Sequence, residues 1–209
     1  MSNLIQSTTK LAMHIAAPYI RPDATLVDAT CGNGHDSLAL AQALFADNAK
    51  ADADTDAKAD AGRLYAFDIQ HQAVEATKTL LEGEGFGEQI TKGSIRLICD
   101  SHENMDQHLD HADVIIFNLG YLPGGDKTLT TTAETTMTAI KDALLLLDAG
   151  GLICITMYSG HEAGAYEKAQ LLQFAERLDS KQWHVAYINM INQANNPPEI
   201  LLITRKLDK

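Results

Sequence analysis

Residues 25–36 read Thr25-Leu-Val-Asp-Ala-Thr-Cys-Gly-Asn-Gly-His-Asp36. The segment begins as a short apolar strand, turns through a Gly-x-Gly loop and continues into a helix expected from His35 to Ala46. Glycines at 32 and 34 let the backbone turn tightly and approach a ligand where a side chain would clash. This order of strand, glycine loop and helix predicts the first unit of an α/β sheet with a nucleotide-type site.

The same alternation continues along the chain. Further strands are expected at 63–68, 95–100, 113–118 and 151–158, and further helices at 8–19, 71–81, 102–109, 131–147 and 163–178. The last two strands, 183–191 and 199–205, are joined by a turn-rich connector without a helix, which predicts a hairpin. We therefore expect one domain spanning residues 1–209, with an α/β, doubly wound, Rossmann-like, mostly parallel seven-stranded sheet and a C-terminal antiparallel hairpin.

The composition is that of a globular protein. Of the 209 residues, 45% are hydrophobic and 21% are charged, which argues against disorder. The longest unbroken apolar run, 143–147, is far shorter than the roughly 20 residues of a membrane span. The N-terminal segment 1–22 is helical in pattern rather than a secretory signal, and three cysteines without metal-like spacing indicate reduced thiols. We expect a cytoplasmic protein with no membrane partner and no metal.

The net charge of −12 bears on the partners. A low-complexity insertion at 46–62 holds five Asp and two Lys, so it contributes −3 and leaves −9 for the rest of the chain. Nucleic-acid binders usually carry a basic face, because phosphate contacts supply much of their affinity. The acidity therefore favours a small-molecule substrate, or an RNA held by a local basic patch only.

Acidic residues stand at the ends of two further expected strands. Asp68 is suited to binding ribose hydroxyls, and its distance from the glycine loop is typical of a nucleoside-binding fold once the insertion is removed. Asp100-Ser101-His102 follows the third strand, where an adenine edge is expected. Both acids precede expected helices, so a role as helix N-caps is the structural alternative.

NAD(P) and S-adenosylmethionine (SAM) both suit such strand ends. The dinucleotide fingerprint needs Gly or Ala at the position of Ser37, and the chain offers no hydride-transfer constellation. Asp28 and the glycine loop can instead face the methionine portion of SAM, whose ammonium needs a carboxylate or carbonyl partner. We therefore predict a class I SAM methyltransferase fold. Its candidate cofactor-binding residues are Asp28, Thr30, Cys31, Gly32, Asn33, Gly34, Asp36, Asp68, Gln70, Asp100, Ser101, His102 and Asn118.

The fourth strand ends in Asn118-Leu-Gly-Tyr121. This ending resembles the Asn/Asp-Pro-Pro-Tyr motif of amino-group methyltransferases, with Leu119-Gly120 in place of the prolines. In that motif the amide oxygen and the next backbone carbonyl accept hydrogen bonds from the amine and aim its lone pair at the methyl group. Asn118 and Tyr121 are therefore candidate catalytic residues, and a strand-ending Asn beside a packed Tyr is the structural alternative. An aliphatic amine and the exocyclic amine of a base both stay open as targets.

Taken together, these motifs resemble those of the YtqB-type family, labelled as rRNA methylases. The matching segments are DATCGNGHDSLALA, AFDIQ, DSHENM, IIFNLGYLPGGDK with the Thr130-Thr-Thr132 run, and GGLICITMYSGHEAG. The resemblance implies a SAM-dependent methyltransferase that acts on tRNA and converts the aminomethyl group of the wobble uridine, often 2-thiolated, to 5-methylaminomethyluridine. It also implies that Asn118 and the Leu119 carbonyl hold the amine and that Tyr121 contacts the uracil. The insertion at 46–62 departs from the family pattern.

An alkylamine is mostly protonated at neutral pH, so some group must accept a proton before the amine can attack. His161 is the candidate for that role or for orienting the amine, and a structural histidine that caps the next helix is the alternative. Lys127 and Arg21 are candidates for phosphate contacts or solvated surface residues, and Thr130–Thr132 is expected to start a helix.

The functional reading leaves alternatives open. They are methylation of rRNA, methylation of a small-molecule amine, which the acidic surface favours, and a SAM-binding module without catalysis. The oligomeric state also stays open, a homodimer included.

Overall fold

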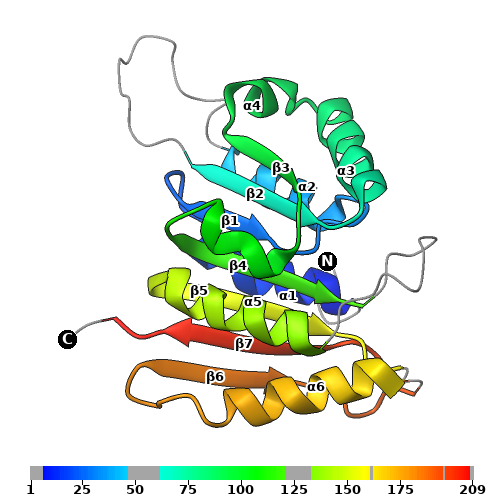
Figure 1. The fold of residues 1–209 in the computed structure, drawn as a ribbon, viewed down its shortest axis with the longest axis vertical. Coiled ribbons are helices and arrows are strands. Elements are labelled where there is room, and N and C mark those ends of the chain that lie inside the picture. Colours follow the sequence, from blue (N-terminus) through cyan, green and yellow to red (C-terminus); the bar gives the residue numbers. More distant parts are fainter. Residues whose placement is uncertain (1–6, 47–61, 121–132, 161, 195, 208–209) are drawn as a thin grey trace.

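The computed structural model describes residues 7–46, 62–120, 133–160, 162–194 and 196–207. Seven strands form one sheet in the order β3-β2-β1-β4-β5-β7-β6, seen from top to bottom in Figure 1. The strands are β1 (Thr25–Asp28), β2 (Arg63–Asp68), β3 (Ile95–Cys99), β4 (Ala112–Leu119), β5 (Leu147–Met157), β6 (Trp183–Ile188) and β7 (Glu199–Arg205).

The strand directions confirm the expected doubly wound sheet. Strands β1 to β5 pair in parallel, and β7 is antiparallel to both β5 and β6. The strand order reverses between β1 and β4, which is the topological switch point where such sheets bind ligands. The C-terminal hairpin is also confirmed, because β6 and β7 follow each other along the chain and pair antiparallel. The single-domain assignment stays a prediction.

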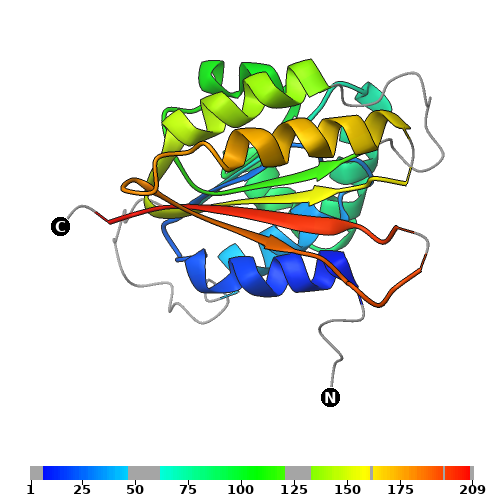
Figure 2. The same cartoon turned by 90° about the horizontal axis from the view of Figure 1, so that it is seen from below.

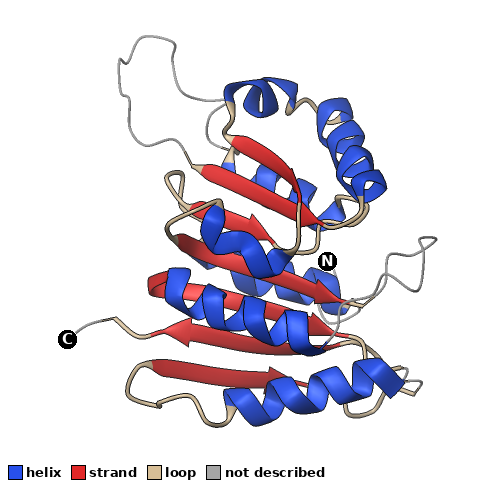
Figure 3. Ribbon diagram, viewed as in Figure 1, coloured by secondary structure: helices blue, strands red, loops and turns tan. Residues whose placement is uncertain are grey.

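Helices cover both faces of the sheet. They are α1 (Thr8–Ala16), α2 (His35–Leu44), α3 (His71–Gly83), α4 (Gly87–Lys92), α5 (Ala133–Leu146) and α6 (Glu162–Ala175), with 3₁₀ helices η2 (Ala17–Tyr19) and η3 (His102–Gln107). Figure 2 shows α1 and α2 on one face and α5 and α6 on the other, and Figure 3 shows the strands between these layers. Within the described residues, none of these helices is long and apolar enough to span a membrane.

Two apolar clusters hold the layers together, one on each face of the sheet. On the first face, buried side chains of β4 such as Ile115 and Phe117 pack with Ile140 of α5. On the other face, Leu26 of β1 packs with residues of α1 and α2 such as Ala12 and Leu40. The strands β1 and β4 are buried on both sides, as central parallel strands usually are, so their apolar runs lack alternation.

The structure differs from the sequence expectation at several element ends. The N-terminal helix changes to η2 at Ala17, because Pro18 has no N–H to continue the α-helical pattern. Strand β5 begins four residues earlier than expected, at Leu147, where it pairs with Ala112 beside an irregularity in register. Helix α4 lies in a glycine-rich stretch for which no helix was expected, and β6 ends at Ile188 rather than at residue 191.

Candidate active site

The site lies at the carboxyl edge of the sheet, where β1 ends at Asp28 and β4 ends at Leu119. The candidate residues from the glycine loop, from β2 and from β4 come together here. Tyr121, Lys127, Thr130–Thr132, His161 and most of the 46–62 insertion fall outside the described residues, so the expectations for them stay predictions.

The glycine loop is clamped between β2 and α3. The Cys31 N–H donates to the Phe67 carbonyl (2.8 Å), and the Gly34 N–H donates to the Cys31 carbonyl (2.7 Å). Gly34 has φ +83°, and a Cβ there would lie 2.8 Å from Thr77 Cα, so only glycine fits. Cys31 is buried, and this burial raises the pKa of its thiol. Asn33, in contrast, is exposed at the tip of the loop.

Asp68 ties the end of β2 to the glycine loop. Its carboxylate accepts the Gly32 N–H (3.1 Å) and the Gln70 N–H (2.9 Å). A carboxylate offers about four lone-pair sites, so the predicted contact with ribose hydroxyls remains open to it. The next residue, Ile69, exposes 51% of its surface. The sequence analysis did not predict this apolar surface beside Asp68. The sequence pattern that could have indicated it is an apolar residue directly after the acid that ends the strand.

The Asp100 carboxylate is hydrogen-bonded by neighbouring residues in and beside η3 and by His108. It accepts hydrogen bonds from the Ser101 N–H (2.7 Å) and Asn104 Nδ2 (2.9 Å), and it pairs with His108 Nε2 (2.9 Å). The bond from His108 holds the pKa of Asp100 below its ordinary value. Ser101 is the N-cap residue of η3, and its hydroxyl accepts the Glu103 N–H. Asp100 itself is therefore not the N-cap that the structural alternative expected, because Ser101 has that role. A contact of Asp100 with adenine stays a prediction.

His102 is buried beneath the loop after β1. Its Nδ1 lies 3.1 Å from the Ala29 carbonyl, and its ring meets Phe117 edge to face. Burial lowers the pKa of His102, so the ring is neutral with Nδ1 as the donor. Its Nε2 is then a buried acceptor without a partner in the described part of the chain.

Asp28 is fully buried at the end of β1. It accepts hydrogen bonds from Ser37 Oγ (2.6 Å) and from the Thr30 N–H (3.2 Å), and so supports the loop from beneath. Burial raises the pKa of Asp28 to about 7, and the neighbouring Asp36 carboxylate adds to the rise. In this conformation Asp28 does not reach the surface, so its direct contact with a ligand stays a prediction.

Asn118 is held at two points of the site. Its backbone N–H donates to Thr30 Oγ1 (2.7 Å), and its side-chain Nδ2 donates to Asp36 Oδ2 (3.2 Å). Because an ionised carboxylate only accepts, the amide nitrogen must face Asp36 and the amide oxygen must face away. That oxygen, Oδ1, is buried and has no partner among the described residues. The site therefore presents an acceptor that lacks a donor.

Tyr158, which follows β5, is a neighbour of this site that sequence reasoning missed. Its ring lies against Gly120, where a Cβ would be 3.7 Å from Tyr158 Cδ2. Burial raises the pKa of the Tyr158 phenol. The charge of Asp36 adds to this rise, and hydrogen bonding with Thr9 and Asn118 opposes it. The sequence indicated this residue only weakly, because Tyr158 lies in the segment GGLICITMYSGHEAG, in which His161 was the functional candidate.

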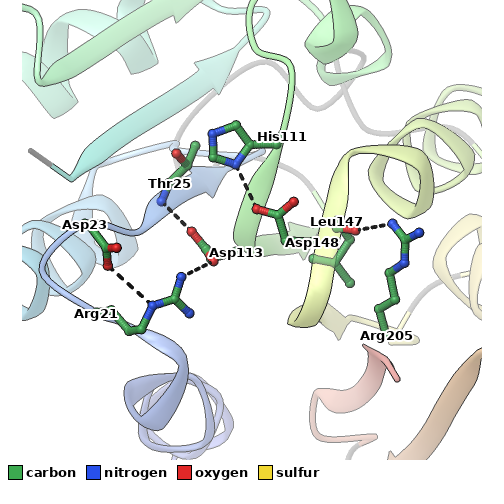
Figure 4. A network of polar contacts seen from close by, with 8 residues as sticks. All are labelled: Arg21, Asp23, Thr25, His111, Asp113, Leu147, Asp148 and Arg205. Carbon is green, nitrogen blue, oxygen red and sulfur yellow. Dashed lines mark hydrogen bonds and ion pairs between the residues drawn. The ribbon is translucent and has the colours of Figure 1, made fainter. Parts of the chain in front are cut away.

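Arg21 lies at the amino edge of the sheet, opposite the candidate site, and the expectation that it contacts a substrate phosphate stays a prediction. Its guanidinium donates to Asp113 Oδ1 (2.8 Å) and also pairs with Asp23. Figure 4 shows this contact beside Thr25, whose N–H donates to the other oxygen of Asp113.

The chemistry of the site fits SAM. Asp28 and Asp36 adjoin each other, and within the described residues neither forms an ion pair with Lys or Arg. A cationic ligand would compensate this excess of negative charge, and SAM carries an ammonium and a sulfonium. Asp68 and the exposed face of Ile69 offer a polar and an apolar surface for a nucleoside.

Comparisons with known proteins agree with this fit. A family model described as "Putative rRNA methylase" matches residues 64–204. The chain is 32% identical over 204 residues to a protein of Arabidopsis thaliana named tRNA (mnm(5)s(2)U34)-methyltransferase, chloroplastic, and the match covers 96% of this chain and 70% of the relative.

Two solved structures are similar over nearly their whole length. A protein of Clostridium thermocellum described as a "putative rRNA-methylase" is 33% identical, with a TM-score of 0.83 over 96% of this chain and 98% of that one. A protein of Streptococcus mutans described as a "putative methyltransferase", in complex with SAH (S-adenosylhomocysteine), is 28% identical, with a TM-score of 0.76 over 98% of this chain and 99% of that one. The cofactor is SAM. The chain belongs to the rRNA-methylase family of class I SAM methyltransferases.

Proposed function

We propose that the protein is a cytoplasmic N-methyltransferase that methylates the aminomethyl group of the tRNA wobble uridine. The observation that carries the proposal is the buried Asn118 Oδ1, which faces away from Asp36 and has no donor within the described ranges. A primary amine supplies such a donor. The name of the Arabidopsis thaliana relative, a tRNA wobble-uridine methyltransferase, supports tRNA as the substrate.

The proposed chemical role of Asn118 is to orient the substrate amine. Asn118 Oδ1, with the Leu119 carbonyl, accepts hydrogen bonds from the amine and directs its lone pair toward the cofactor. Thr30 and Asp36 fix Asn118 from two sides, so little reorganisation is needed when the substrate binds. Bound SAM supplies a methyl group on a sulfonium. The gain in rate then comes mainly from holding the reacting atoms in line.

Two other substrates have a specific observation in their favour. The description of the family model favours rRNA. The net charge of −12 favours a small amine over a polyanion. The unpartnered Asn118 Oδ1 speaks against a module that only binds SAM, because SAM binding alone does not require an amine acceptor at this position.

The test is transfer of a labelled methyl group from SAM to three kinds of acceptor. These are tRNA that carries 5-aminomethyluridine, total rRNA and a panel of small amines, with the product nucleoside identified by mass spectrometry. We expect label in 5-methylaminomethyluridine. Label only in rRNA or in a small amine would replace the substrate and keep the enzyme class, and SAM binding without any transfer would contradict the proposed enzyme activity.

A further inference from the structure

We propose that Asp36 is the group that receives the substrate ammonium and accepts its proton, in place of the His161 expected from the sequence. This inference rests on the proposed function. Asp36 Oδ2 lies 3.2 Å from Asn118 Nδ2, on the same side chain whose Oδ1 lacks a partner among the described residues. Asp36 therefore directly contacts the side chain that holds the amine in the proposed function.

The surroundings of Asp36 leave it available for a cation. Asp36 is partly buried, and its described hydrogen bond is the one from Asn118. The ionisable groups that act on or near it are Asp28 of β1, the adjacent His35, and Cys154 and Tyr158 from β5 and its end. None of these is a Lys or an Arg, so the described residues hold no permanent cation against this carboxylate.

The carboxylate is also tuned for proton transfer. Burial raises the pKa of Asp36 above its ordinary value, and the bond from Asn118 and the charge of His35 oppose that rise. A raised pKa makes a carboxylate a better base. Asp28, at a pKa of about 7, is buried beneath the loop and has both oxygens engaged, so it is the less accessible of the two.

The proposed step transfers one proton to Asp36 and one methyl group to the amine. The ammonium gives one proton to Asp36, which becomes a neutral carboxylic acid, and the amine keeps its lone pair. That lone pair forms the new nitrogen–carbon bond as the carbon–sulfur bond of SAM breaks and its electron pair stays on sulfur. The product is a secondary ammonium together with SAH, and the Asp36 proton passes to solvent before the next turnover.

The test is the Asp36→Asn variant, which keeps an acceptor for Asn118 Nδ2 and removes the base. With an amine pKa of about 10, only about 0.1% of it is neutral at pH 7, so we expect transfer to fall by about 100- to 1,000-fold. The loss should shrink about tenfold with each pH unit, because the neutral amine no longer needs a base. The melting temperature should stay near the wild-type value, and transfer is measured at saturating SAM, with SAH affinity from calorimetry, so that a loss of cofactor binding is told apart from a loss of the base.

Two further variants sharpen this test. Asp36→Glu, which keeps the charge, should recover part of the rate at pH 7, and Asp110→Asn is the matched control at an exposed site. The inference is overturned if Asp36→Asn loses SAH affinity but transfers normally at saturating SAM, which would place Asp36 on the cofactor. A flattened pH dependence in Tyr158→Phe with an unchanged Asp36→Asn profile would also overturn it. Absence of transfer by the wild-type protein to any amine would overturn the proposed function together with this inference.

Discussion

The two edges of the sheet both carry acidic side chains, but those at the amino edge have basic partners, whereas Asp28 and Asp36 at the carboxyl edge form no ion pair within the described part of the chain. At the amino edge, Asp113 accepts from Arg21 and from the Thr25 N–H, and His111 meets Asp148 at 2.8 Å (Figure 4). At the carboxyl edge, Asp28 and Asp36 adjoin each other without a cation among the described residues, and Asn118 Oδ1 has no donor.

This difference between the two edges indicates that the cluster at the amino edge has a structural role. His111, Asp113 and Asp148 bring ligand atoms within 4.8 Å of one another, yet each is explained by a protein contact. Unsatisfied buried polar atoms cost free energy, so a native fold keeps them mainly where a ligand completes them. The amino edge therefore fastens the ends of β1, β4 and β5, whereas the open acceptor at the carboxyl edge supports the binding role proposed for it.

The largest expected effect is that of Asn118→Ala. Removal of the amide oxygen leaves the amine without its acceptor, so methyl transfer should fall by about 100- to 1,000-fold through lost positioning. SAM affinity should change by only a few-fold. Gln182→Ala, an exposed amide near the far edge of the sheet, is the control. Unchanged turnover in Asn118→Ala would contradict the role of this residue and remove the main distinction between the two edges.

The next effect is that of Gly34→Ala in the glycine loop. The methyl group would lie 2.8 Å from Thr77 Cα at a φ of +83°, so both strain and a backbone clash oppose it. We expect the free energy of unfolding to drop by about 2–4 kcal/mol. Urea denaturation measures this, with Gly160→Ala as the control, because a Cβ there meets nothing within 4 Å. Equal losses in both variants would show that the approach of the loop to α3 is unimportant.

Most of the fold could be predicted because strand and helix patterns are local. The apolar runs of β1 and β4 and the glycine loop between β1 and α2 appear directly in the sequence. The early start of β5 could not be predicted, because Asp148-Ala-Gly-Gly151 has the composition of a turn, and the strand begins before it only because Leu147 pairs with Ala112. The change to η2 was missed because only the apolar spacing was followed past Pro18.

The site was predictable in its location but not in its contacts. Strand ends identified Asp68 and Asn118, since parallel strands bring their carboxyl ends to one edge. The bond between Asn118 and Asp36 spans 82 positions of sequence, and no local pattern indicates it. For the same reason, the His108 side chain that engages Asp100 and the Tyr158 ring that lies on Gly120 appeared only in the structure.

At the amino edge, Asp113→Ala should affect stability and leave catalysis intact. The substitution strands the buried Thr25 N–H and frees Arg21, so we expect a loss of about 2–3 kcal/mol in the free energy of unfolding. Asp23→Asn, which removes the exposed partner of the same Arg21, should cost less than about 1 kcal/mol. A fall in methyl transfer by the folded Asp113→Ala protein would show that the two edges are coupled.

The last prediction concerns the pH dependence of stability at the carboxyl edge, where the change within any one pH unit is small. The folded-state pKa of Asp28, about 7, exceeds its ordinary value of 3.8 because of burial, so between these values the folded protein binds a proton that the unfolded chain releases. This group therefore lowers stability as pH rises from about 4 to 7, by at most ~1.4 kcal/mol per pH unit. Asp28→Asn keeps acceptors and donors for Thr30 and Ser37, so it should flatten the curve and gain relative stability toward neutral pH. Urea denaturation at a series of pH values measures the difference, and an equal slope in both proteins would mean that Asp28 is ionised at the same cost in the folded and unfolded states.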